Sequence, residues 1–148
     1  MELVMRYFLS MLLVIGWAAQ AEPVKEIVIE PVGDELKFKQ TEFTVQPGET
    51  VRLIFKNTAK VMPHNVVVLN TSSPAVVNRV GTAAITAKDY VPDDPAILAY
   101  TKLAQPGETV EVTFKAPATP GRYRYICTFP GHFSMMQGTM VVAPKPAS

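Results

Sequence analysis

Short runs of β-branched and aromatic residues, separated by Pro-Gly turns, recur along this chain and limit the folds that it can adopt. Pro-Gly pairs at 47–48, 106–107 and 120–121 mark turns between such runs. Two runs, 51–55 and 110–114, alternate apolar with polar residues, as half-buried strands do. Strands are predicted at residues 27–30, 43–45, 51–56, 66–69, 109–114, 123–127 and 139–142. This spacing predicts an all-β domain, a Greek-key sandwich or barrel.

One stretch, about 70–105, interrupts the strand pattern and is too long for a hairpin loop. Ser73-Pro74 fits a helix N-cap followed by proline at the first helical position. Apolar residues that could form one helix face follow: Ala75, Val76, Val77, Val80, Ala83 and Ala84. We therefore expect one helical flap inserted into the β-domain.

Residues 1–21 have the features of an export signal. Arg6 precedes an apolar stretch over 7–19, and Ala19-Gln20-Ala21 is a small-x-small cleavage site. We expect cleavage after Ala21, a mature domain over 22–148 without a membrane span, and a periplasmic location. An uncleaved anchor is the alternative, although the apolar run is shorter than the roughly 20 residues that a bilayer requires. Either Met1 or Met5 could be the true start.

The net charge argues against a nucleic-acid binder, and the cysteine content excludes an intrachain disulfide. The chain has 14 Lys+Arg against 13 Asp+Glu, so its net charge of +1 lacks the basic excess of a nucleic-acid binder. The lone cysteine, Cys127, can form no intrachain disulfide. In an exported protein an unpaired cysteine is buried and inert, reactive, or a metal ligand.

Four residues form the candidate site: His64, Cys127, His132 and Met136. Cys127, His132 and Met136 fall within ten positions, and the turn at Pro130-Gly131 can fold their side chains toward a common point. His64 lies far upstream, just before a predicted strand that a sandwich can bring alongside. The chain has two histidines and one cysteine, and this one site would use all of them.

The chemical softness of these donor atoms, two imidazoles, a thiolate and a thioether, indicates which metal they would bind. Thiolate and thioether favour copper, and a trigonal His₂Cys site with a weak axial Met is the blue-copper electron-transfer arrangement. Zinc accepts Cys and His, but the thioether of Met is not among its usual ligands. A Cys–His pair could also serve thiol catalysis in a hydrolase, but Asn65 is the only candidate orienting group near it.

The motif His64-Asn65, then Cys-Thr-Phe-Pro-Gly-His over 127–132, Met136 and Gly-Thr resembles the cupredoxin (blue copper) family, azurins in particular. The similarity covers about residues 34–143 and includes the flap segments 88–94 and 99–103. It implies that His64, Cys127 and His132 are equatorial ligands of one type 1 copper, Cu(II)/Cu(I), and that Met136 is the axial ligand.

The resemblance also implies roles for neighbouring residues. The backbone N–H groups of Asn65 and Phe129 would donate to the ligating sulfur, and Asn65 and Thr128 would tie the two ligand segments together. The sequence departs from azurins at three points. Pro63 replaces a glycine, Val66 replaces a common tryptophan, and the N-terminal disulfide is missing.

By this resemblance the protein is expected to be a monomeric periplasmic electron carrier and not an enzyme. Its partners would be redox proteins, either c-type cytochromes or a periplasmic reductase or oxidase. They would dock on an apolar patch around His132 formed by Met62, Phe129, Pro130, Phe133 and Met135, although Phe133 could equally be a core residue. A copper chaperone or storage protein with the same ligands is the alternative.

Overall fold

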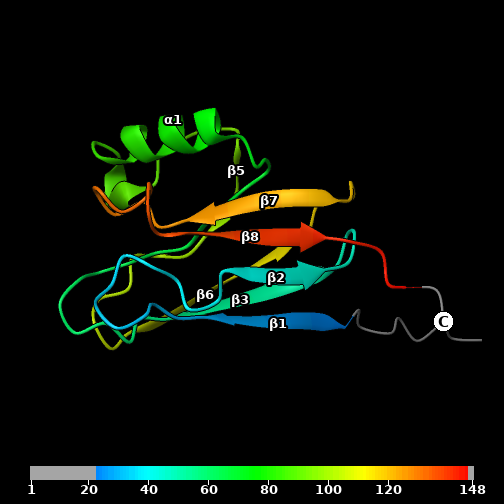
Figure 1. Cartoon of the computed structure of the whole chain (residues 1–148), viewed down its shortest axis with the longest axis horizontal. Helices are drawn as coiled ribbons and strands as arrows, with labels where there is room; N and C mark the ends of the chain where they lie inside the picture. The colour runs from blue at the N-terminus through cyan, green and yellow to red at the C-terminus, as the bar shows by residue number, and fades with distance from the viewer. Residues whose placement is uncertain (1–22, 147–148) are drawn as a thin grey trace, which may run out of the picture.

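A computed structural model describes residues 23–146 and arranges them as two packed β-sheets with one helix outside the sandwich (Figure 1). The expected signal segment, 1–21, lies outside the described residues. No helix within 23–146 combines the length and the apolar character needed to cross a membrane.

The strands of the two sheets follow the predicted pattern. One sheet has the order β1-β3-β6, from Val24–Ile29, Thr50–Lys56 and Thr109–Lys115. The other has the order β2-β8-β7-β4-β5, from Glu42–Val45, Gln137–Val142, Gly121–Ile126, Val67–Leu69 and Ile97–Tyr100. Two pairs, β1 with β3 and β2 with β8, are parallel, and the other pairs are antiparallel. This connectivity confirms the predicted sandwich with a helical insertion.

The core lies between the sheets, where the inward residues of each strand meet. On β3 the inward Val51, Leu53 and Phe55 are fully buried, whereas Arg52 and Ile54 between them face outward. Aromatic packing links the sheets, because the Phe38 ring meets Phe55 edge-on at 6.2 Å and lies 5.5 Å from the Tyr125 ring. Alternation in the sequence therefore translates directly into a buried face.

The flap forms a helix, α1 (Pro74–Ala84), and a short 3₁₀ turn, η1 (Lys88–Tyr90). Ser73 and Pro74 begin α1 as predicted, although the Ser73 side chain makes no capping hydrogen bond. The helix lies against the outer side of the five-stranded sheet (Figure 1) and contributes to a second apolar cluster. Its buried residues are Val77, Val80, Gly81 and Ala84, whereas Ala75 and Ala83, expected on the apolar face, are exposed.

Strand β5 was not predicted, since its sequence Ile-Leu-Ala-Tyr shows no alternation and lies inside the flap segment. It pairs antiparallel with β4, with Val67 opposite Tyr100 and a register shift between Val68 and Leu69. The chain therefore leaves the sheet after β4, forms the helix, and returns to β4's edge. The insertion is anchored to the sheet at both ends.

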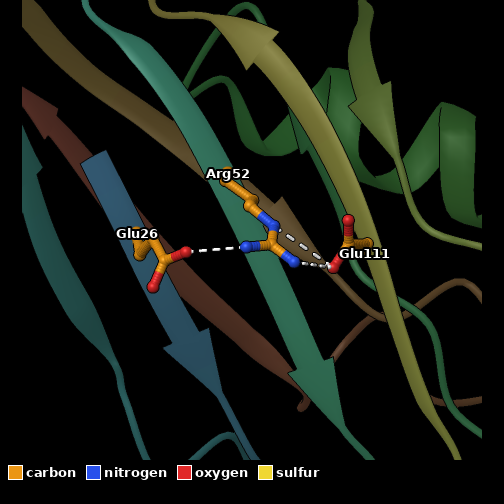
Figure 2. Close-up of polar contacts among 3 residues, drawn as sticks. All are labelled: Glu26, Arg52 and Glu111. Atoms are coloured by element: carbon orange, nitrogen blue, oxygen red, sulfur yellow. Dashed lines mark hydrogen bonds and ion pairs between the residues drawn. The ribbon is translucent and has the colours of Figure 1, made fainter. Parts of the chain in front are cut away.

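Arg52 links all three strands of the smaller sheet on its outer face (Figure 2). Its guanidinium donates to Glu26 on β1 at 2.7 Å and to Glu111 on β6 at 2.7 and 3.2 Å. Exposed ion pairs of this kind contribute little to stability, because solvent screens them. The buried face, and not this charge cluster, therefore holds the sheet together.

A test of the helix packing is the substitution Gly81→Ala. A Cβ at Gly81 would lie 2.1 Å from the Phe133 ring. Helix propensity alone would make alanine more stable by about 1 kcal/mol. We expect the clash to reverse this sign and to lower the free energy of unfolding in urea by about 1–3 kcal/mol.

The matched control is Ala83→Gly on the exposed face of the same helix. It should cost about 1 kcal/mol through propensity alone. An increase in stability for Gly81→Ala would show that Phe133 does not pack against this helix.

Candidate metal centre

Three of the four predicted site residues converge in the structure. The Sγ of Cys127 lies 3.7 Å from Nδ1 of His64 and 3.7 Å from Nδ1 of His132, and the two Nδ1 atoms are 3.2 Å apart. Their exposed fractions are 0%, 0% and 3% for His64, Cys127 and His132. The strand pairing explains the convergence, because Val67 on β4 lies opposite Ile126 on β7. The residues just before β4 and just after β7 therefore meet at one end of the sheet.

The triangle formed by these three atoms has the size of a metal site. The point equidistant from its corners lies about 2 Å from each atom, the usual length of a bond from zinc or a similar transition metal to an imidazole nitrogen. Two imidazoles and one sulfur are the donor set that suits copper. The residues present therefore fit the ion that the sequence pattern predicted.

Burial sets the protonation of these donors. It lowers the pKa of His64 to about 4, with a further contribution from the nearby His132, and it lowers the pKa of His132 as well. Both imidazoles are therefore neutral at pH 7, with a lone pair available for a metal. Burial raises the pKa of Cys127 to about 11, partly opposed by hydrogen bonds from the backbone of Asn65 and Phe129. These are the two N–H donors that the resemblance implied.

The loop before His64 is fixed by backbone contacts. His64 and Ala104 exchange two backbone hydrogen bonds, at 3.1 and 2.8 Å. The buried Asn57 donates through Nδ2 to the carbonyls of Met62 at 3.0 Å and Ala104 at 2.9 Å. Asn57 was not predicted as a site residue, although a polar residue directly after a predicted strand was the available signal. Asn57 therefore fixes the path of the chain into His64.

The loop from Cys127 to His132 and Met136 folds back on itself. The N–H of Cys127 donates to the carbonyl of Met136 at 3.0 Å, and the N–H of Met136 donates to the carbonyl of His132 at 2.8 Å. Met136 is fully buried in the core, whereas the neighbouring Met135 is 69% exposed. This difference supports Met136, and not Met135, as the methionine at the site.

Asn65 and Thr128 join the two segments that supply the donors. Asn65 Oδ1 accepts the backbone N–H of Thr128 at 2.8 Å, and its Nδ2 donates to Thr128 Oγ1 at 2.9 Å. Thr128 Oγ1 also donates to the carbonyl of Tyr90 in the flap at 2.6 Å. Both Asn65 and Thr128 are fully buried. The link expected from the resemblance is present, and it extends to the flap.

Aromatic side chains cover His132. The Phe129 ring meets it edge-on at 4.9 Å, and Tyr90 packs edge-on against Phe129 at 5.2 Å.

Met62, Pro130 and Phe133 are partly buried. Phe133 packs under α1 with Val77 and Val80, so much of its ring belongs to the core of the flap. Tyr90 was not predicted, since its position depends on the left-handed backbone at Asp89 and Tyr90.

Comparison with known proteins gives this fold and site a family. Residues 26–143 match the copper binding proteins of the plastocyanin/azurin family. The chain belongs to this family and is a cupredoxin, an electron-transfer copper protein with copper as its cofactor.

Individual relatives agree with this assignment. Auracyanin-A of Chloroflexus aurantiacus is 45% identical over 119 residues, which cover 78% of this chain and 73% of auracyanin-A. Azurin of Pseudomonas chlororaphis is 36% identical over 117 residues, which cover 74% of this chain and 91% of that azurin. The solved structure of auracyanin A, described as a "blue" copper protein, superposes with a TM-score of 0.78 at 42% identity, covering 82% of this chain and all (100%) of that one.

The two adjacent methionines offer a matched test of the axial position. Met136→Leu conserves volume, so the fold should survive at a cost below about 1.5 kcal/mol. We expect copper to be retained and the reduction potential measured by voltammetry to rise. Loss of the thioether and exclusion of water from the site both disfavour the more highly charged oxidised state. Met135→Leu should leave the potential unchanged. A shift in Met135→Leu without one in Met136→Leu would reverse the assignment.

Removing the Asn65 link should destabilise the site. In Asn65→Ala the buried N–H of Thr128 loses its acceptor, and we expect the free energy of unfolding in urea to fall by about 1–3 kcal/mol. The control is Asn70→Ala, whose exposed side chain donates to the carbonyl of Pro95 at 3.0 Å and should change stability by less than about 0.5 kcal/mol. Equal losses in the two variants would contradict a special role for Asn65.

Proposed function

We propose that this cupredoxin is a periplasmic one-electron carrier that holds copper between His64, Cys127 and His132, with Met136 in the axial position. The observation that carries the proposal is the buried triangle of two Nδ1 atoms and one Sγ, all within 4.8 Å of one another. Such a donor set with a weak axial thioether matches blue-copper electron-transfer sites. Copper supplies the exchange of single electrons between Cu(II) and Cu(I).

The protein's part in this function is to keep the donors fixed. His64 is held by Ala104, Cys127 by the carbonyl of Met136, and the two segments by Asn65 and Thr128. Donors that do not move between oxidation states keep the reorganisation of the site small. The N–H groups of Asn65 and Phe129 at the sulfur of Cys127 lower its basicity and help to set the potential.

We propose that electrons pass through the His132 side of the site. His132 is 3% exposed and lies under Phe129, and the exposed Met135 and Val61, at 69% and 68%, come from the two loops that carry the donors. A small apolar surface suits brief docking of redox partners. We propose c-type cytochromes or a periplasmic reductase or oxidase as those partners.

The location in the periplasm rests on the export signal at residues 1–21 and its cleavage site after Ala21. A copper chaperone or store with the same ligands is less well supported, because rapid exchange requires access to the donors. His64 and Cys127 are both fully buried.

The first experiment is the visible absorption spectrum of the mature domain after addition of Cu(II). We expect an intense red-orange band that a reductant bleaches and an oxidant restores, because a Cys127 thiolate bound to Cu(II) would give a strong charge-transfer absorption. Cys127→Ser should lose this band and keep the far-ultraviolet circular dichroism of the folded sandwich. Persistence of the band in Cys127→Ser would overturn the ligand assignment.

A further inference from the structure

The loop between β1 and β2 reaches the segment that leads into His64. Asp34 in this loop accepts two backbone hydrogen bonds through Oδ1, from the N–H of Lys60 at 2.7 Å and of Val61 at 3.1 Å. Hydrogen bonds from a backbone N–H to a carboxylate are among the stronger ones in proteins. Asp34 therefore clamps the chain three and four residues before His64.

The imidazole of His64 lacks one restraint that metal-binding histidines usually have. Its Nδ1 faces Cys127 and His132, so the neutral ring carries its proton on Nε2. Nε2 is buried and has no hydrogen-bond partner among residues 23–146. A metal-binding histidine usually donates this second N–H to an acceptor that fixes the ring. The ring of His64 lacks this restraint, so packing and the backbone that presents the ring must hold it, and the clamp on that backbone contributes to its position.

Asp34 also brings a negative charge to the segment that leads into His64. Its carboxylate oxygen lies 3.1 Å from the backbone nitrogen of Val61, three residues before His64. A carboxylate near a metal site stabilises the more positive oxidised state over the reduced state. The Asp34 side chain is exposed, so salt should weaken this effect.

We propose that Asp34 is a positioning residue of the copper site, which fixes the backbone that presents His64 and lowers the reduction potential with its carboxylate. The effect on the potential rests on the proposed function, whereas the clamp does not. The two effects are separable, because an asparagine keeps an Oδ1 acceptor and removes the charge.

The experiment compares Asp34→Asn, Asp34→Ala and the control Glu49→Gln in the mature domain. Glu49 is the matched control, since its Oε2 also accepts a backbone N–H, from Gln46 at 2.8 Å. It directly precedes β3, whereas His64 follows that strand, so the same charge is lost at the opposite end of the sheet. Amide hydrogen exchange of Lys60 and Val61 is measured on the metal-free proteins, and the potential on the copper-loaded ones at low and high salt.

In Asp34→Ala we expect exchange at Lys60 and Val61 to accelerate about tenfold or more. In Asp34→Asn it should stay close to the wild-type rate. Both variants should have a more positive potential than wild type, with a larger shift at low salt, and Glu49→Gln should show neither change.

Unchanged exchange in Asp34→Ala would overturn the clamp. An unshifted potential in Asp34→Asn, or an equal shift in Glu49→Gln, would overturn the electrostatic role. If the copper-loaded wild-type protein lacked the intense absorption band, the proposed function would be overturned. The amide exchange rates of the metal-free variants would still show whether Asp34 clamps the backbone of Lys60 and Val61.

Discussion

Three donor atoms buried against one another at one end of the sandwich are the constraint that the surrounding structure serves. Burial of polar groups without partners costs free energy, and the two Nδ1 atoms and the sulfur lie within 3.2–3.7 Å of one another. The apolar core of the two sheets offsets this cost, since strands β3, β4 and β7 contribute fully buried residues to the same core cluster as Cys127. The fold therefore brings three buried donor atoms to one point, where a bound cation would satisfy them.

Polar clamps hold the segments that carry the donors, in addition to the strand pairing that brings these segments together. Asn57 and Asp34 hold the loop that leads into His64, and Asn65 joins this segment to Thr128, which in turn donates to the carbonyl of Tyr90 in the flap. Several of these contacts bridge residues far apart in the sequence, by 26 positions for Asp34–Lys60 and by 63 for Asn65–Thr128, whereas Asn57 and Met62 are 5 positions apart. The site is therefore a product of the whole fold, although most of its donors come from one ten-residue loop.

The sequence predicted the sandwich and the donor set because both have local signals. Alternating strands and Pro-Gly turns determine the sheets, and the spacing of Cys127, His132 and Met136 is visible within one loop. Strand β5 lacks alternation, so only its pairing with β4 identifies it. Asp34, Asn57 and Tyr90 escaped prediction for a similar reason. Their roles depend on tertiary contacts across the molecule, and a local signal, such as the polar Asn57 directly after a predicted strand, does not show which partner the side chain meets.

The flap covers one side of the candidate metal site. Ile126, next to Cys127, is fully buried under α1 together with Val77 and Val80, and Thr128 on the other side is fully buried and bonded to the flap. Protein therefore covers the chain on both sides of Cys127. The turn at Phe129 and Pro130 and the exposed Met135 leave His132 as the donor nearest to solvent. This asymmetry agrees with the proposed passage of electrons on the His132 side, because the flap covers the residues on either side of Cys127.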